Sequence, residues 1–507
     1  MLVRSKKAVL GMVAAGAAMA SGCAVPAPGG VSESRETRFR AKLSSFLDRL
    51  NRDPNAPPGA VVVVVHGKDT VFARAYGVRD AATGAPLNLD TPVYTASTTK
   101  SYVGLLAAEL DRKRLLPLTT TLADVWPDLR LKAPLDPQRI SAAQLLSHAA
   151  RFTDSGLAFK SNSTGQYTLE EVPQHLARYG EALDKPFEYS NFGPFLYSMM
   201  VEKKLGIGWR DALSHHVLEP LRLRRTSARI EDFKSAEIAR CHLRRSSRAN
   251  WQPMPLKPTP LLNASGGIYA SGRDSAAYLK AFTSSGRSSG GRIPASSADL
   301  TGRVFSQQEA ERWGFRRSAY GLGWDIGTYG SHEVLVRAGG FPGCRALFAV
   351  YPTAKLAVGV LTVSEAGANS YNAAIAQQAI DIWTADPGAE AAAQRRISGF
   401  ATEAAEAVAA LDRAWKAIPT LPSMEMPNDL AGRYDSDRLG TFVVTRQGDR
   451  LLARMGEFRL SLTAVEPDKF YAFAANDPEP EVFTFVRDRE RRPIRMMWDD
   501  RAFERVP

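Results

Sequence analysis

Residues 60–66 read Ala-Val-Val-Val-Val-Val-His, a continuous apolar run that is rich in β-branched side chains. A run of this kind is typical of a buried strand, whereas a half-exposed strand alternates polar and apolar residues. Residues 70–76 predict a second strand, and residues 67–69 form the turn that joins the two into a hairpin. The chain is therefore expected to fold around a sheet that begins with a buried strand.

Helices and further strands follow the hairpin in a definite order. Helical patterns, broken by Pro and Gly, dominate residues 140–280. Strands are expected again at residues 334–338, 345–351 and 356–363, before a helix near residues 368–383. This order predicts an α/β (α+β) domain, in which helices flank an antiparallel sheet and a helical segment is inserted.

The last part of the chain has a different texture. A stretch rich in Ala and charged residues, followed by prolines, indicates a helical linker over residues 386–427. Beyond it, six or more short segments of alternating hydrophobicity predict a small β-barrel or sandwich over residues 428–507. The preceding domain is then expected to cover residues 36–385, with the boundary near residue 420.

The first residues predict export. Three basic residues precede a run of 13 small and apolar residues, which is too short to span a bilayer comfortably. Small residues directly before Cys23 resemble the signal of a bacterial lipoprotein, in which residues 1–22 are removed and Cys23 is lipidated. An ordinary secretory signal that is cleaved nearby is the alternative. Residues 23–35 would then form a flexible tether.

Composition limits the possible partners. Hydrophobic residues make up 44% and charged residues 23%, which excludes wholesale disorder and a polytopic membrane protein. The formal net charge of +12 falls to +9 when the three basic residues of the signal are removed. The chain shows no recognised nucleic-acid motif, so no such partner is expected. The charge suits an anionic envelope surface, and we expect an exported, membrane-anchored lipoprotein of a bacterial envelope.

Ser97 and Lys100 lie three residues apart where the chain enters a predicted helix. Residues at this spacing share a helix face, so the Lys100 amine can reach the Ser97 hydroxyl. A serine hydroxyl needs a base to become a nucleophile, and a lysine whose pKa is lowered by burial can serve. Chance gives about one or two such pairs in a chain of this length, so the pair alone also fits a serine that caps a surface helix.

Further motifs follow in a specific order. Tyr189 and Asn191 in Tyr-Ser-Asn offer a phenol for proton relay and an amide for a substrate carbonyl. Tyr-Gly-Leu-Gly-Trp at residues 320–324 precedes Gly-Gly-Phe-Pro-Gly at residues 339–343. Together with the Ser-Thr-Thr-Lys motif, this set resembles the serine β-lactamase-related family, which comprises class C β-lactamases, D-alanyl-D-alanine peptidases of that type and related esterases. The resemblance covers about residues 40–385.

The resemblance implies both a fold and residue roles. The fold would be an antiparallel sheet flanked by helices with an all-α subdomain, followed by a small lipocalin-like barrel. Ser97 would be the acylated nucleophile, Lys100 its base partner and Tyr189 a second base or proton relay. Asn191 would contact the substrate amide, and the backbone N–H groups of Ser97 and Gly340 would form the oxyanion hole. Neither a metal nor another cofactor is implied.

One motif departs from the family pattern, which usually shows Lys or His, then often Thr or Ser, then Gly. Here the residues are Arg337, Ala338 and Gly339. Arg337 stays protonated, so it cannot shuttle protons, but it could bind a substrate carboxylate or crowd the cleft. Gly339 and Gly340 are expected to line the substrate site. The lost hydroxyl at Ala338 argues against an efficient β-lactamase and favours an esterase or peptidase.

Two functions stay open. The first is a serine hydrolase that acts on an ester, an amide or a D-amino-acid peptide in the cell envelope. The second is a catalytically weak or inactive relative that binds small molecules or peptides without turnover. The sequence leaves the substrate, the role of the barrel and the oligomeric state open.

Three residues are interpreted as structural. His148 is expected to be a hydrogen-bonding residue rather than a base, because Lys100 and Tyr189 already fill that role. Cys344 is read as a buried, inert thiol. A disulfide between Cys241 and Cys344 stays open, because sequence alone does not fix the distance between them.

Overall fold

The computed structural model describes residues 34–244, 250–284, 293–416, 427–448, 450–473 and 479–507. The predicted signal and its lipidation site, Cys23, lie outside these residues. In the part of the chain that the structure describes, no helix combines the length and the apolar character needed to cross a membrane.

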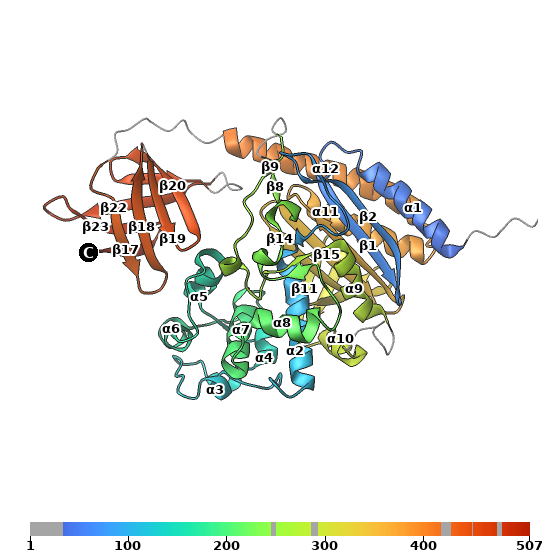
Figure 1. Ribbon diagram of the computed structural model, residues 1–507, viewed down its shortest axis with the longest axis horizontal. Helices are drawn as coiled ribbons and strands as arrows, with labels where there is room; N and C mark the ends of the chain where they lie inside the picture. Colours follow the sequence, from blue (N-terminus) through green and yellow to red (C-terminus); the bar gives the residue numbers. More distant parts are fainter. Residues whose placement is uncertain (1–33, 245–249, 285–292, 417–426, 449, 474–478) are drawn as a thin grey trace, which may run out of the picture.

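An antiparallel sheet of nine strands forms the centre of the larger domain (Figure 1). Its order is β11-β12-β13-β14-β15-β16-β1-β2-β3, so the predicted hairpin of β1 and β2 pairs with strands from the far end of the domain. The strands are β1 (Gly59–His66), β2 (Asp69–Asp80), β3 (Ala85–Pro86), β11 (Ser306–Arg312), β12 (Phe315–Tyr320), β13 (Asp325–Tyr329), β14 (His332–Phe341), β15 (Cys344–Tyr351) and β16 (Leu356–Thr362).

The valine run of β1 is buried because both faces of the sheet are covered. Val61 and Val63 pack into one hydrophobic core, whereas Val62 and Val64 pack into another on the opposite face. Successive side chains of a strand point to opposite faces, so a continuous apolar run serves two cores at once. Full burial of each valine contributes about 1.5–3 kcal/mol, which anchors the strand at this position.

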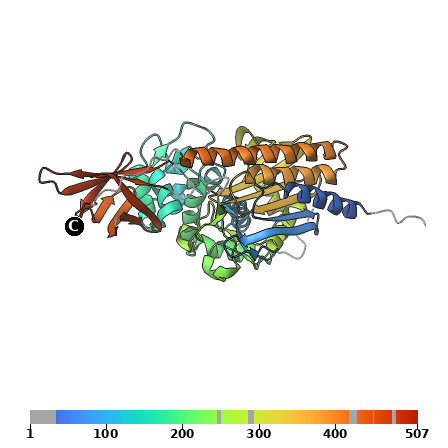
Figure 2. The ribbon, with the colours of Figure 1, turned by 90° about the horizontal axis from the view of Figure 1, so that it is seen from above.

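Helices cover the two faces in separate groups. One face is covered by α1 (Arg35–Leu50), α11 (Ala368–Trp383) and α12 (Ala389–Lys416). Figure 2 shows α11 and α12 as two orange helices that lie along the sheet. On the other face lie α2 (Thr99–Arg112) and α9 (Gly272–Thr283). The segment predicted as a helical linker thus contributes α12 to a core, through Phe400 among others.

A helical subdomain is inserted between the two parts of the sheet, as the sequence predicts. Its helices pack on the core that contains α2. They are α3 (Leu122–Val125), α4 (Ala142–Leu146), α5 (Ser155–Phe159), α6 (Glu171–Tyr179), α7 (Phe192–Leu205) and α8 (Trp209–Leu213). The short helix α10 (Ala295–Thr301) follows α9. The predicted fold class, an antiparallel sheet with flanking helices and a helical subdomain, is confirmed.

The C-terminal residues form a closed eight-stranded barrel, in which β17 pairs with β24. Aromatic side chains such as Phe442, Phe470 and Phe483 fill the interior, as expected for a barrel of this size. The strands are β17 (Gly432–Ser436), β18 (Gly440–Gln447), β19 (Arg450–Met455), β20 (Phe458–Glu466), β21 (Lys469–Ala472), β22 (Glu481–Arg487), β23 (Pro493–Trp498) and β24 (Arg501–Val506). The predicted barrel is confirmed.

The barrel contacts the helical subdomain through polar groups beside α5 and α6 (Figure 1). The His175 ring lies between a carboxylate and a carbonyl: Nδ1 is 2.7 Å from Asp154 Oδ2, and Nε2 is 2.9 Å from the carbonyl oxygen of Arg438. The Arg438 side chain also donates to Glu181. Because histidine bridges the two bodies from a buried position, the barrel is oriented by specific hydrogen bonds.

A disulfide joins Cys241, just before β8 (His242–Leu243), to Cys344 at the start of β15. The interpretation of Cys344 as a free, inert thiol is therefore wrong. Sequence periodicity does not show which loops meet, and these two cysteines are 103 residues apart. The bond ties the loop before β8 to the turn that follows β14.

Removal of this disulfide is expected to lower the free energy of unfolding by about 3–4 kcal/mol, because a loop of this length loses much entropy when it is cross-linked in the unfolded chain. The change is Cys241→Ala with Cys344→Ala, and the measurement is urea denaturation. Dithiothreitol should shift the midpoint of the wild type but not that of the variant. An unchanged wild-type midpoint in the reductant would contradict the expectation.

Candidate active site

Ser97 lies in a tight turn, η1 (Ala96–Thr98), that leads directly into α2. Ala96 adopts a φ of 47°, in the left-handed region that a non-glycine residue rarely occupies. The turn is held from behind, because the Thr95 hydroxyl donates to the Ile268 carbonyl over 2.9 Å. Ser97 is only partly buried, whereas its neighbours in the turn are buried. This arrangement fixes one hydroxyl at an accessible point.

Lys100 is almost completely buried, and its Nζ contacts three oxygen atoms. It donates to Asn191 Oδ1 over 2.8 Å and to the Ser265 carbonyl over 2.7 Å, and Ser97 Oγ lies 3.3 Å away. The first two oxygens can only accept, so they use two amine hydrogens. Burial lowers the pKa of Lys100. In the neutral amine, the remaining lone pair therefore faces the Ser97 hydroxyl.

Tyr189 lies opposite Lys100, in the segment that precedes α7. The Lys100 Nζ is 4.9 Å from the centre of the Tyr189 ring, and 42% of this residue is exposed. Burial acts to raise the pKa of the Tyr189 phenol, but the charges of Arg337 and Lys100 outweigh it and bring the pKa down from 10.0 to about 8. The phenol is thus within reach of its ionised form near neutral pH.

Arg337 on β14 points into the site. Its guanidinium donates to the Tyr189 hydroxyl over 2.9 Å, to the Tyr320 hydroxyl over 2.7 Å and to the Ala338 carbonyl over 3.1 Å. Each of its three nitrogen atoms therefore already donates to a protein oxygen. Although burial opposes the charge, the nearby phenols and Asp325 keep the pKa of Arg337 above its ordinary value.

Two charged residues behind Arg337 were missed by sequence reasoning. The Asp325 carboxylate lies 3.6 Å from Arg337 and 3.4 Å from Arg317, and all three side chains are buried. A buried cation needs a partner, and Asp325 supplies it. The available signal was an aspartate directly after the Tyr-Gly-Leu-Gly-Trp motif, at the start of β13.

His148 packs against the same group of aromatic rings. Its ring centre is 4.6 Å from that of Tyr189 and 4.7 Å from that of Tyr320. Its Nδ1 accepts a hydrogen bond from the Ser190 backbone over 3.3 Å. Burial, followed by the charges of Lys100 and Arg337, holds the pKa of His148 well below its ordinary range. The neutral ring therefore orients the Tyr189 segment.

The end of β14 passes against the Ser97 turn. A Cβ at Gly339 would lie only 2.1 Å from the Thr95 carbonyl oxygen and 3.0 Å from the Ser97 nitrogen, so only glycine fits there. Gly340 follows on the exposed side of this contact. The structure thus brings the predicted residues Ser97, Lys100, Tyr189, Asn191, Arg337, Gly339 and Gly340 to one place.

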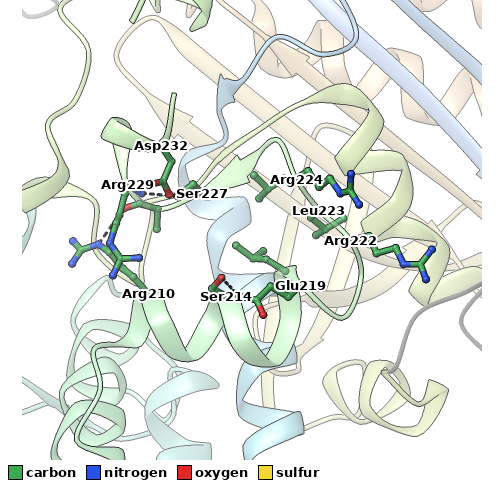
Figure 3. A pocket seen from close by; sticks show the side chains of 12 residues that line it. Arg210, Ser214, Glu219, Arg222, Leu223, Arg224, Ser227, Arg229 and Asp232 are labelled. Atoms are coloured by element: carbon green, nitrogen blue, oxygen red, sulfur yellow. Dashed lines mark hydrogen bonds between the residues drawn. The ribbon is translucent and has the colours of Figure 1, made fainter. Parts of the chain in front are cut away.

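Two cavities help to delimit the site. One of about 570 Å³ lies beside Tyr189 and Arg337, and Phe187 and Gln308 also line it. Figure 3 shows another, of about 290 Å³, in the helical subdomain. Arg210 and Arg229 line that second cavity, but none of the predicted site residues does. In the described part of the chain, no cluster of three or more His, Cys, Asp or Glu residues could hold a metal ion.

The beta-lactamase family model matches residues 47–380, which is well over half of the chain. The chain belongs to the beta-lactamase family. Within this family, the segment that contains the site is fully covered by the match, whereas the barrel lies outside it. The predicted resemblance is therefore confirmed, and the serine-hydrolase class follows from it.

Curated and solved members of the beta-lactamase fold show its breadth. An unguisins hydrolase of Aspergillus campestris is 26% identical over 63% of this chain, which matches only 60% of that relative's length. The octameric penicillin-binding protein homologue from Pyrococcus abyssi superimposes with a TM-score of 0.57, covering 91% of this chain and 99% of its own, at 18% identity. D-amino acid amidase from Ochrobactrum anthropi covers 70% and 98%, with a TM-score of 0.55 and 21% identity.

Proposed function

We propose that this protein is a serine hydrolase that forms an acyl-enzyme at Ser97 and acts on an ester, an amide or a D-amino-acid peptide. One observation carries the proposal: Lys100 spends two hydrogens on Asn191 and Ser265 and faces Ser97 with its third position. A structural lysine would need no serine at that point. The amidase and hydrolase names among the similar proteins support the same reaction class.

The first step transfers the Ser97 proton to the pair formed by Lys100 and Tyr189. The Ser97 oxygen attacks the substrate carbonyl, and the negative charge that forms on the carbonyl oxygen is bound by the backbone N–H groups of Ser97 and Gly340. The pair then returns the proton to the leaving group, whose bond to the acyl carbon breaks. Water attacks the acyl-enzyme in the same way and restores the Ser97 hydroxyl.

Asn191 and Arg337 orient this pair. Asn191 fixes the Lys100 amine through its side-chain oxygen, which leaves its amide hydrogens for a substrate carbonyl. Arg337 stabilises the Tyr189 phenolate and thereby sets the pH at which the pair can accept a proton. Lys100 and Tyr189 titrate together, so this pH belongs to the pair.

Arg337→Met is expected to shift the rise in activity to higher pH. In the wild type, kcat/KM should increase as pH rises through about 8, the pKa of Tyr189, because the pair must first lose a proton. Without the arginine charge, burial raises this pKa toward or above its ordinary value. A shift of two pH units lowers the accepting fraction at pH 7 by about 100-fold.

The measurement is kcat/KM between about pH 6 and 10, with Arg337→Lys as the matched variant that keeps a positive charge. Arg337→Lys should retain an inflection closer to that of the wild type. An inflection that stays in place in Arg337→Met would show that the arginine does not control the titration.

The proposed reaction is tested with a short-chain p-nitrophenyl ester, a chromogenic cephalosporin and a D-amino-acid amide. We expect turnover of the ester or the amide and a mass increase on the Ser97 peptide. If no donor is turned over and Ser97 gains no mass, the alternative function, binding without turnover, replaces the proposal.

We also propose that the chain is exported and anchored through a lipid on Cys23. The Cys241–Cys344 disulfide supports export, because structural disulfides persist mainly in oxidising compartments. Cys23→Ser is expected to move the protein from the membrane fraction to the soluble fraction of a bacterial host, as followed by immunoblotting. An unchanged distribution would exclude Cys23 as the anchor.

A further inference from the structure

A second lysine lies close to the site. Lys257 belongs to the loop between β9 (Gln252–Pro253) and η7 (Thr259–Leu261). Its Nζ is 3.3 Å from the Tyr94 hydroxyl and 5.1 Å from the centre of the Phe341 ring. Tyr94 lies three residues before Ser97, and Phe341 directly follows Gly340. The ammonium group is thus placed by the two segments that carry the proposed oxyanion donors.

A chain of contacts connects Lys257 with the nucleophile. The Tyr94 hydroxyl donates to the Gly266 carbonyl, next to the Ser265 carbonyl that accepts from Lys100. A Cβ at Gly266 would lie 3.7 Å from the Tyr94 hydroxyl and 3.5 Å from the Ala96 carbonyl carbon. The two lysines are near enough for the Lys100 charge to lower the pKa of Lys257, which burial and this charge bring to about 8.

Lys257 has no anionic partner among the residues that the structure describes. No carboxylate there lies within the 4.0 Å of an ion pair, and its one described hydrogen bond goes to the neutral Tyr94 phenol. Aromatic faces of Tyr94 and Phe341 supply the rest of its surroundings. Two of its three N–H donors are therefore left for another molecule.

The other cation of the site cannot take this role as easily. Every nitrogen of Arg337 already donates to Tyr189, Tyr320 or Ala338, and Asp325 balances its charge. A partly buried ammonium without a counter-ion is costly, and a bound anion would offset that cost. Lys257 is thus the described cation of this site whose charge and donors are both uncommitted.

We propose that Lys257 binds a carboxylate of the substrate, on the side of Ser97 that carries Gly340 and Phe341. The inference rests on the proposed hydrolase function and names its substrate class: acyl donors that bear an anionic carboxylate near the scissile bond. Lys257 determines specificity and takes no part in the proton transfers at Ser97.

The test compares matched esters with and without a carboxylate. One pair is the phenylacetyl ester of 3-hydroxybenzoic acid against that of 3-hydroxybenzamide, with the charge in the leaving group. The second pair is monophenyl glutarate against the phenyl ester of glutaramic acid, with the charge in the acyl part. The wild type should prefer the acid in at least one pair, as measured by kcat/KM.

Lys257→Met is expected to lower this preference, the ratio of kcat/KM for acid over amide, by about 10- to 100-fold, because a charge-assisted contact is lost. Lys257→Arg should retain most of it. Lys234→Met removes a charge from a side chain that is 86% exposed and should leave the ratio unchanged. An equal ratio in the wild type and Lys257→Met for both pairs overturns the proposal.

A binding measurement separates this proposal from the hydrolase function. In Ser97→Ala protein, calorimetry should show tighter binding of the acid than of the amide, and Lys257→Met should remove the difference. If the wild type never acylates but this difference persists and depends on Lys257, the hydrolase function fails and the carboxylate site stands. If acylation occurs without any acid preference, the carboxylate site fails alone.

Discussion

Ser97→Ala is expected to reduce hydrolysis by about 10⁵-fold, to near the rate in buffer, because no other hydroxyl can form the acyl-enzyme. Ser97 is the residue that faces the Lys100 amine at 3.3 Å, in a turn that its neighbours hold from behind. The side chain is only partly buried, so its loss should leave the free energy of unfolding nearly unchanged.

Initial rates with a p-nitrophenyl ester and mass spectrometry of the intact protein measure the effect. Ser318→Ala is the matched control, since Ser318 is exposed on β12, and it should keep full activity and full acylation. Wild-type rates in Ser97→Ala, with an unchanged thermal midpoint in both variants, would remove Ser97 as the nucleophile.

Lys100→Met is expected to lower kcat by about 10³- to 10⁴-fold, because it removes the group that accepts the serine proton. Methionine has a similar length and no charge, so it fills the buried space without a hydrogen-bond donor. The Asn191 and Ser265 oxygens lose their shared donor, and a loss of about 1–3 kcal/mol in stability should accompany the change.

The double variant separates catalysis from stability. Residues that act as one unit are not additive, so Ser97→Ala with Lys100→Met should be no slower than Ser97→Ala alone. Single-turnover acylation of Lys100→Met, followed between about pH 6 and 10, gives the rate of the first step. Acylation at the wild-type rate would show that Lys100 only packs beneath the serine.

Much of the fold was predictable because local patterns specify it. The valine run of β1, the later strands and the alternating segments of the barrel all carry the period of their structure in sequence. The spacing of Ser97 and Lys100 likewise fixes their contact, since a helix start leaves few other arrangements.

Contacts between distant segments were not predictable in the same way. The partners of Arg337 come from β12, β13 and the segment before α7, and no sequence spacing relates these elements. The Cys241–Cys344 bond and the position of Lys257 against Tyr94 also depend on where loops meet in space. Such contacts are decided by packing, and a single sequence records only the residues involved.

The position of β1 within the sheet has a consequence for how the chain folds. Ala60 pairs with Thr362, so the first strand stays without one neighbour until about three hundred further residues have been synthesised. Contacts between such distant residues form late and slowly, and an unpaired apolar strand is prone to aggregate in the meantime. The larger domain therefore cannot be completed while the chain is still emerging from the ribosome before residue 362, which leaves the nascent protein dependent on chaperones.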